Sequence, residues 1–172
     1  MTVAVFPGSF DPLHNGHLEV VERACRIFDQ VVVAAIRNPQ KSQASFDLAE
    51  RKEMLEEALA HLPRVRVVSM STLVVNVARD VGATVIVRGL RAVSDFENEL
   101  QMSQMNRQLS GIETVFIPTS SAHSFIASKL LKEVVRYGGD VSPFVPESIN
   151  RRLKEKLAGP DDGGGDTGPE GE

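Results

Sequence analysis

A short polar run near the start of the chain, residues 7–17 (PGSFDPLHNGH), has the composition of a phosphate-binding turn. It separates an apolar stretch, residues 3–6, from a helical pattern, which predicts a strand, a turn and the start of a helix. Backbone N–H groups converge at such a turn, and the first turn of the helix adds partial positive charge. Gly8 has no Cβ, so the backbone there can come close to a ligand. The run therefore predicts a site for a nucleotide triphosphate.

Two histidines in this run, His14 and His17, are three residues apart and can face the same side of the first helical turn. A neutral imidazole can donate a hydrogen bond to a phosphoryl oxygen, and a protonated one also offsets negative charge. The alternative is that one histidine caps the helix and the other packs against it. The pair behind a strand and a Gly-Ser turn favours phosphate contact.

Length and composition indicate one globular domain. The chain has 172 residues, of which 42% are hydrophobic and 24% are charged. Residues 159–172 carry five acidic side chains and no basic one, which leaves 18 acidic and 19 basic residues in the rest of the chain. We expect residues 1–158 to form an α/β domain and residues 159–172 to be a disordered, acidic, glycine-rich tail. The near-neutral domain argues against nucleic acid as a partner.

The cellular setting is predicted from three further features. Cys25 is the only cysteine, so no internal disulfide is possible, and its helical spacing with other apolar residues predicts core packing. No apolar run is long enough to cross a bilayer, and no basic leader follows Met1. We expect a cytoplasmic protein with no membrane partner.

The elements that would position the site alternate along the chain. Apolar runs predict strands at residues 3–6, 31–36, 65–68, 84–87 and 114–117. Amphipathic patterns predict helices at residues 17–28, 48–62, 73–80, 94–109 and 124–136, and a last one after Pro146. This alternation predicts a Rossmann-like, doubly wound, five-stranded parallel sheet with a C-terminal helix.

Polar and basic residues follow the predicted strands. Lys41 comes after the second strand, and Arg88 and Arg91 come after the fourth. Because the carboxyl ends of parallel strands meet at one edge, we expect these cations to lie near the two histidines. They would form a clamp for a polyphosphate.

Motifs of other enzyme classes are absent. The sequence has no P-loop, no dinucleotide-binding Gly-x-Gly-x-x-Gly, no Cys–His metal spacing and no Gly-x-Ser-x-Gly elbow. We therefore expect no metal site made by the protein. A site of this kind suits attack by one substrate on a phosphorus atom of another, where positioning and charge stabilisation supply most of the catalysis.

Two blocks resemble a known family. Residues 8–17 (GSFDPLHNGH) are similar to the signature of the HxGH nucleotidyltransferases. Residues 88–102 (RGLRAVSDFENELQM) closely resemble the bacterial phosphopantetheine adenylyltransferases, and this second block is the more discriminating one. Shorter matches at residues 106–107, 124–126, 132–134 and 139–141 extend the resemblance over residues 3–157.

The resemblance implies a reaction and its partners. ATP and 4′-phosphopantetheine would give 3′-dephospho-coenzyme A and pyrophosphate, by direct in-line attack without a covalent enzyme intermediate. Mg²⁺ would be held mainly through the phosphates of ATP. The family also implies a homohexamer and coenzyme A as a feedback ligand.

The resemblance assigns residues by position. The catalytic residues would be His17, Lys41 and Arg91. Those holding phosphopantetheine would be Ser9, Lys41, Val74 and Arg88. Those binding ATP would be Ser9, Phe10, His17, Gly89, Leu90, Arg91, Glu99, His123, Ser124, Phe125, Ile126, Ala127, Ser128 and Lys129.

The chain departs from the family pattern at three places. His123 stands where the family usually has a large aromatic residue, and Ala127-Ser128-Lys129 replaces a run of three serines. Two hydroxyl donors are lost there and a cation is gained, so Lys129 could pair with the β- or γ-phosphate. His14 stands where the family more often has threonine, which is closer to the wider superfamily.

Other interpretations stay open at this point. A related nucleotidyltransferase could act on nicotinate mononucleotide or a phospho-alcohol, although residues 88–102 disfavour it. A non-catalytic ATP-binding module would leave His14, His17 and Lys41 unexplained, and a class I tRNA synthetase needs a much longer chain. Met102 and Met105 could fill the core, form a subunit contact or line the acceptor site.

Overall fold

The structure is a computed structural model that describes residues 1–37 and 44–158. Its core is one parallel sheet of five strands in the order β3-β2-β1-β4-β5. The strands are β1 (Val3–Gly8), β2 (Gln30–Ile36), β3 (Val65–Met70), β4 (Val85–Leu90) and β5 (Glu113–Pro118). Six α-helices and a short 3₁₀ helix, η1 (Ser142–Phe144), alternate with them or follow them. The α-helices are α1 (Asn15–Ile27), α2 (Leu48–Leu59), α3 (Val74–Val81), α4 (Val93–Ser110), α5 (Ser128–Arg136) and α6 (Glu147–Leu157).

This order confirms the predicted doubly wound α/β fold with a C-terminal helix. The chain builds outward from β1 to β3 in one direction, and then returns to build β4 and β5 on the other side of β1. The strand order therefore reverses next to β1, and ligands of such sheets bind at the carboxyl ends of the strands at that point. The predicted Lys41 and the predicted tail, residues 159–172, lie outside the described residues.

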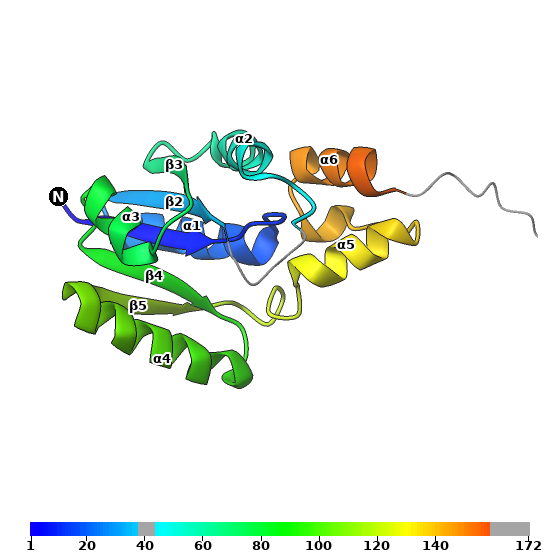
Figure 1. Cartoon of the computed structure of the whole chain (residues 1–172). Coiled ribbons are helices and arrows are strands. Elements are labelled where there is room, and N and C mark those ends of the chain that lie inside the picture. Colours follow the sequence, from blue (N-terminus) through cyan, green and yellow to red (C-terminus); the bar gives the residue numbers. More distant parts are fainter. Residues whose placement is uncertain (38–43, 159–172) are drawn as a thin grey trace, which may run out of the picture.

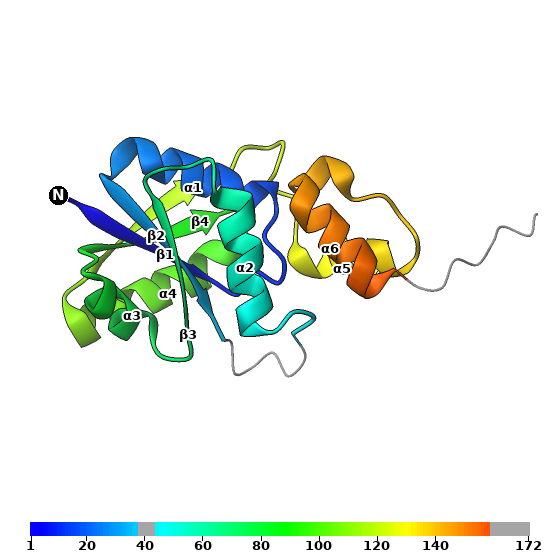
Figure 2. The same cartoon turned by 90° about the horizontal axis from the view of Figure 1, so that it is seen from above.

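Both faces of the sheet are covered, as Figures 1 and 2 show. Alternate residues of β1 point to opposite faces. Ala4 and Phe6 join a buried cluster with residues of α1 and α2, whereas Val3 and Val5 join a second cluster with residues of α3. Burial on both faces explains why β2 has no alternation of polar and apolar residues.

Helices α5 and α6 lie beyond the carboxyl ends of the strands, at the right of Figure 1. Leu131 of α5 and the fully buried Ile149 and Leu153 of α6 join the same core cluster as α1 and α2. Lys156 of α6 forms an ion pair with Glu50 of α2. The sheet edge that should hold the site is therefore bordered by a helical layer on this side.

Several boundaries differ by two to four residues from the sequence predictions. Strands β1 and β3 extend two residues further, to Gly8 and Met70, and α2 ends three residues earlier, at Leu59. Strand β4 continues to Leu90 rather than ending at residue 87, because the register that pairs Arg88 with Phe116 extends to Leu90 and Pro118. Helix α1 begins at Asn15 because His14 caps it. Helix α5 begins at Ser128, four residues later than predicted.

The prediction for Cys25 is confirmed, since its side chain packs partly buried against the core cluster and burial raises the pKa of its thiol. Within residues 1–37 and 44–158, no helix is both long enough and apolar enough to cross a bilayer.

Candidate active site

The turn between β1 and α1 folds tightly around an aromatic ring. Phe10 has a φ of 46°, and its side chain is 3% exposed. The ring lies beneath Gly8, where a Cβ would be only 2.8 Å from Phe10 Cζ. It also packs edge-on against Phe6, at 5.4 Å, and against His17, at 5.1 Å between ring centroids. Glycine is therefore required at position 8 for this turn to close.

His14 is a buried helix cap. Its Nδ1 accepts a hydrogen bond from the backbone N–H of Gly16 at 3.1 Å, and the residue is 2% exposed. Burial, with further contributions from Arg91 and His123, lowers the pKa of His14 from its ordinary value of 6.5 to about 3. The ring is therefore neutral near pH 7. Of the two interpretations of the paired histidines, capping is the one this geometry supports for His14.

His17 is held in one orientation by the same cap. Its Nδ1 accepts a hydrogen bond from the backbone N–H of His14 at 3.3 Å, and its ring stacks on that of His14 at 3.7 Å between centroids. A backbone N–H can only donate, so Nδ1 of His17 carries a lone pair. In the neutral ring the proton is then on Nε2, which makes Nε2 a hydrogen-bond donor.

Asp11 connects the centre of the turn to two other segments of the chain. Its carboxylate accepts hydrogen bonds from the backbone N–H groups of Ser45, at 3.0 Å, and Phe46, at 2.9 Å. Lys132 of α5 forms an ion pair with it at 2.7 Å, and both side chains are largely buried. The turn is thereby tied to the start of α2 and to α5. Sequence reasoning assigned no role to this pair.

Arg88 of β4 forms hydrogen bonds with Glu99 of α4 and with Pro7 of β1. It donates from Nε and Nη2 to the carboxylate of Glu99 at 2.7 and 2.6 Å, and from Nη1 to the carbonyl oxygen of Pro7 at 2.8 Å. A guanidinium has five N–H groups, so these contacts with described residues use three of them and leave two for a ligand. The paired side chains of Arg88 and Glu99 are 32% and 21% exposed.

Residues after β4 and β5 meet the turn as well. Arg91 donates from Nη1 to the carbonyl oxygen of Ile126 at 3.1 Å and pairs with Asp95 at 3.3 Å. The hydroxyl of Ser128 donates to the carbonyl oxygen of Pro12 at 2.9 Å. The structure thus brings the β1–α1 turn, Arg88, Arg91 and the start of α5 together at one edge of the sheet.

The segment between β5 and α5 packs against α1. Glu19 of α1 accepts hydrogen bonds from the backbone and side chain of Ser120, and its carboxylate lies 2.6 Å from Nδ1 of His123. A Cβ on Gly16 would lie 3.3 Å from the carbonyl oxygen of His123. Residues 121–125 therefore form turns rather than helix, and α5 begins later than predicted. The role of Glu19 was missed because its partner is 104 residues away.

The remaining predicted residues lie around the same edge. Val74 is the first residue of α3 and is partly buried against the second cluster. Gly89 approaches Val20, whose Cγ2 would be 3.1 Å from an added Cβ, and the carbonyl of Leu90 accepts hydrogen bonds from Thr119. Phe125 is 58% exposed and meets Phe144 edge-on. Ser124 lies in the turns before α5, Ala127 is the residue before the helix, and Lys129 is an exposed residue of its first turn.

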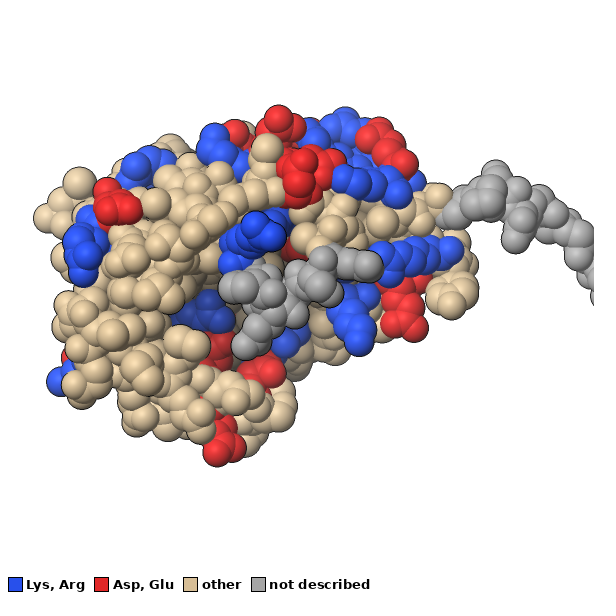
Figure 3. Space-filling view, viewed as in Figure 1, with Lys and Arg blue, Asp and Glu red and all other residues tan. Residues whose placement is uncertain are grey.

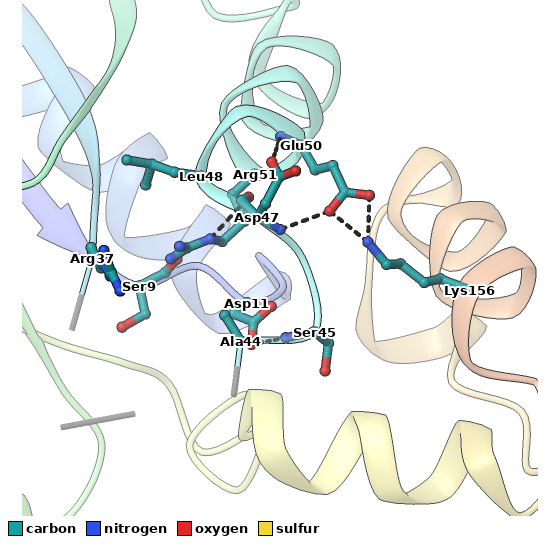
Figure 4. Close-up of a pocket in the computed structure, with 10 residues that line it drawn as sticks. All are labelled: Ser9, Asp11, Arg37, Ala44, Ser45, Asp47, Leu48, Glu50, Arg51 and Lys156. Carbon is teal, nitrogen blue, oxygen red and sulfur yellow. Dashed lines mark hydrogen bonds and ion pairs between the residues drawn. The ribbon is translucent and has the colours of Figure 1, made fainter. Parts of the chain in front are cut away.

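A cavity of about 500 Å³ opens beside the turn, and Figure 4 shows its lining. Of the predicted site residues that the structure describes, only Ser9 lines it. Arg51, which is buried, donates to the carbonyl oxygen of Ser9 at 2.7 Å, and Figure 4 shows Arg37 on the same side of the cavity as Ser9. Figure 3 shows Lys and Arg side chains gathered at the hollow of this face. Arg37 and Arg51 were not predicted, since a single arginine at the end of a strand or within a helix carries no specific signal.

The donor set at this edge does not form a metal cage. In the part of the chain that the structure describes, no three histidine, cysteine or acidic residues group as metal ligands. The carboxylates of Asp11, Glu19 and Glu99 each face a cation or an imidazole.

The fold and this edge define a class of nucleotide-handling α/β proteins, and comparison with known families names the class. A cytidylyltransferase-like family model matches residues 5–134. The chain therefore belongs to the cytidylyltransferase-like family, within the HxGH nucleotidyltransferase superfamily. Membership supports nucleotidyl transfer as the type of reaction.

Proposed function

We propose that this protein transfers the adenylyl group of ATP to 4′-phosphopantetheine, giving 3′-dephospho-coenzyme A and pyrophosphate. The observation that carries the proposal is the meeting of the β1–α1 turn with Arg88, Arg91 and the start of α5 at one sheet edge. The family supports nucleotidyl transfer. The choice of acceptor rests on the resemblance of residues 88–102 to the phosphopantetheine adenylyltransferases.

The chemistry joins two anions. A phosphate oxygen of the acceptor attacks the α-phosphorus of ATP in line, the bond from that phosphorus to the pyrophosphate oxygen breaks, and no enzyme intermediate forms. The attacking phosphate is already anionic, so no general base is needed. The protein supplies position and positive charge instead.

His17, Lys41 and Arg91 are the proposed catalytic residues. His17 has Nδ1 occupied by the backbone N–H of His14, which leaves the proton on Nε2 for donation to an α-phosphate oxygen. Arg91 is braced by Asp95 and by the Ile126 carbonyl, so its charge has a defined position. Preorganised donors of this kind stabilise charge as it grows in the transition state.

Arg88, with Lys41, Ser9 and Val74, would hold the acceptor. The two remaining N–H groups of Arg88 suit a phosphate, which accepts charge-assisted hydrogen bonds from guanidinium. Bracing by Glu99 would reduce the rotamer entropy that Arg88 loses when a phosphate binds.

ATP would bind along the turn and the β5–α5 segment, through the ATP-binding residues given above. Mg²⁺ would enter as part of the substrate MgATP, held by phosphate oxygens and water. The carboxylates of this edge are engaged with cations, which fits a metal carried by the nucleotide better than one held by side chains.

We also propose a cytoplasmic homohexamer with coenzyme A as feedback ligand, following the same resemblance. The exposed apolar side chains of α4 support a subunit contact. They are Val93, Phe96, Leu100, Met102, Met105 and Leu109. The exposure of Met102 and Met105, each at 56%, is against the core interpretation for these two residues.

The test is an acceptor panel. Purified protein with MgATP is given 4′-phosphopantetheine, nicotinate mononucleotide or a phospho-alcohol, pyrophosphate release is followed, and the product is identified by mass. We expect dephospho-coenzyme A with the first acceptor alone. Release with another acceptor would replace the proposed substrate, and no release with any would favour a binding module.

His17→Ala tests the proposed mechanism in the same assay. Loss of one transition-state donor should lower kcat by about 10²–10³-fold, with a smaller change in the KM for ATP. His61→Ala is the matched control, since His61 is exposed and its ion pair with Glu22 is long, at 3.9 Å. A raised KM with normal turnover would contradict the role of His17.

A further inference from the structure

Glu19 of α1 forms hydrogen bonds with two residues of the segment between β5 and α5. One carboxylate accepts from the backbone N–H of Ser120 at 3.0 Å and from its hydroxyl at 2.8 Å, and faces Nδ1 of His123 at 2.6 Å. Arg23, one turn further along α1, lies 3.7 Å from Glu19 and donates to the carbonyl oxygen of Pro118. These polar contacts span the segment from the end of β5 to His123.

The held segment forms a wall of the site. The His123 carbonyl lies against Gly16 in the β1–α1 turn, Arg91 holds the Ile126 carbonyl, and Ser128 holds the Pro12 carbonyl. A shift of this segment would therefore move groups that contact the phosphate turn itself.

We propose that Glu19 is a positioning residue for nucleotide binding, acting through the imidazole of His123. The proposal rests on the proposed function, in which residues 123–129 bind ATP. Glu19 holds the ring by its Nδ1, so that one face and one edge of the ring are presented to the nucleotide in a fixed orientation.

The charge state of Glu19 suits this role. Burial alone would raise the pKa of its carboxyl group, but hydrogen bonds from His123 and Ser120 outweigh that effect and lower the pKa. The group is therefore an anion near pH 7 and accepts hydrogen bonds only. In the neutral tautomer, His123 then carries its proton on Nδ1 and keeps an acceptor at Nε2.

The pair also explains how a histidine can stand at position 123. A large aromatic ring could be held there by stacking area alone, whereas an imidazole has less apolar area. The side chains of His123 and Glu19 are 33% and 17% exposed, so their contact is partly shielded from water. A charge-assisted hydrogen bond in such a setting substitutes for the missing apolar contact.

The experiment is a double-mutant cycle with Glu19→Gln and His123→Phe, read as the KM for ATP, kcat and the KM for phosphopantetheine. Glu19→Gln keeps an oxygen for Ser120 but loses the anionic partner of His123. We expect a rise of about tenfold in the KM for ATP, with kcat and the acceptor KM within about threefold. In the His123→Phe background the same change should have less than about a twofold effect.

Glu22→Gln is the control. Glu22 lies on the same helix, and its ion pair with the exposed His61 is long, at 3.9 Å. It should leave all three constants unchanged. An unchanged KM for ATP in Glu19→Gln would overturn the proposal, and so would an equal rise in both backgrounds, because Glu19 would then act through Ser120 or through the fold.

A thermal unfolding curve for each variant shows whether that variant is folded. If Glu19→Gln is unfolded, His123→Leu removes both the imidazole and its hydrogen bond to Glu19. An unchanged KM for ATP in that variant would overturn the proposal. Wild-type protein that releases no pyrophosphate would overturn the proposed function, and the positioning role with it. An active wild type with an unaffected Glu19→Gln would overturn the positioning role alone.

Discussion

The β1–α1 turn and helix α4 border the same sheet edge, yet they are built in opposite ways. Phe10, Asp11, Leu13 and His14 of the turn are all buried by this chain. In α4, all of which the structure describes, only Asn106 of 18 residues is buried. The shape of the turn is therefore determined within one chain, whereas the exposed apolar side chains of α4 are available to another surface.

The contrast separates two ways of fixing a site residue. His17 is oriented by a buried cap and a ring stack, so its position depends on the folding of the chain itself. Glu99 comes from α4, and its carboxylate is fixed mainly by the ion pair with Arg88. Changes in the turn should therefore alter stability, and changes on α4 should alter the proposed subunit contact.

Asp11→Ala should give the largest effect on stability. It leaves Lys132 buried without its partner and removes the acceptor of two backbone N–H groups. We expect the free energy of unfolding to fall by about 3–5 kcal/mol, measured by urea denaturation.

Glu56→Ala is the control for that experiment. It removes an exposed ion pair with Lys52 on α2 and should cost less than about 1 kcal/mol. If the two variants were equally stable, the turn would not depend on its buried pair, and the contrast with α4 would fail.

The buried cap predicts an acid-sensitive turn. The folded state keeps His14 neutral down to about pH 3, while the unfolded chain takes up a proton below about pH 6.5. The unfolded state then binds more protons, so stability is present above pH 6.5 and is lost as the pH falls. Between pH 7 and 5 the wild type should lose about 2 kcal/mol more than His14→Asn, which can still cap α1 but does not titrate.

Denaturation curves for both proteins at several pH values measure this difference. Parallel loss of stability in wild type and His14→Asn would show that the imidazole is not the titrating group. Carboxylates contribute equally in both proteins, so the difference between their stabilities at each pH reports His14 alone.

Met105→Glu should have the smallest effect on the fold and test the other half of the contrast. The side chain is 56% exposed on α4, so the stability of the chain should change by no more than about 0.5 kcal/mol. Analytical ultracentrifugation should show a smaller particle than the wild type. Tyr137→Glu, at an apolar residue that is 87% exposed elsewhere, should leave the mass unchanged.

The fold was largely predictable because its signals are local. Apolar runs predicted all five strands of the sheet, and the Gly-Ser run with its histidines predicted the turn between β1 and α1. The predicted end of β4 was wrong because Arg88 and Gly89 interrupt the apolar run, although the pairing of β4 with β5 continues through both residues.

The polar contacts of the site were not predictable, because their partners are distant in the chain. Asp11 and Lys132 are 121 residues apart, and Glu19 and His123 are 104 apart. The capping role of His14 depends on the backbone geometry at the start of α1, which residue types alone do not define.

Helix α6 has a consequence for how this protein is produced in the laboratory. The family match ends at residue 134, but Ile149 and Leu153 beyond it are fully buried, and the Nζ of Lys156 lies 5.0 Å from the ring centroid of Phe46. A recombinant fragment cut at the end of the match would uncover Phe46, Leu131 and their neighbours, and would be prone to aggregation. A recombinant form of the protein should therefore extend at least through Leu157, with any affinity tag placed after it.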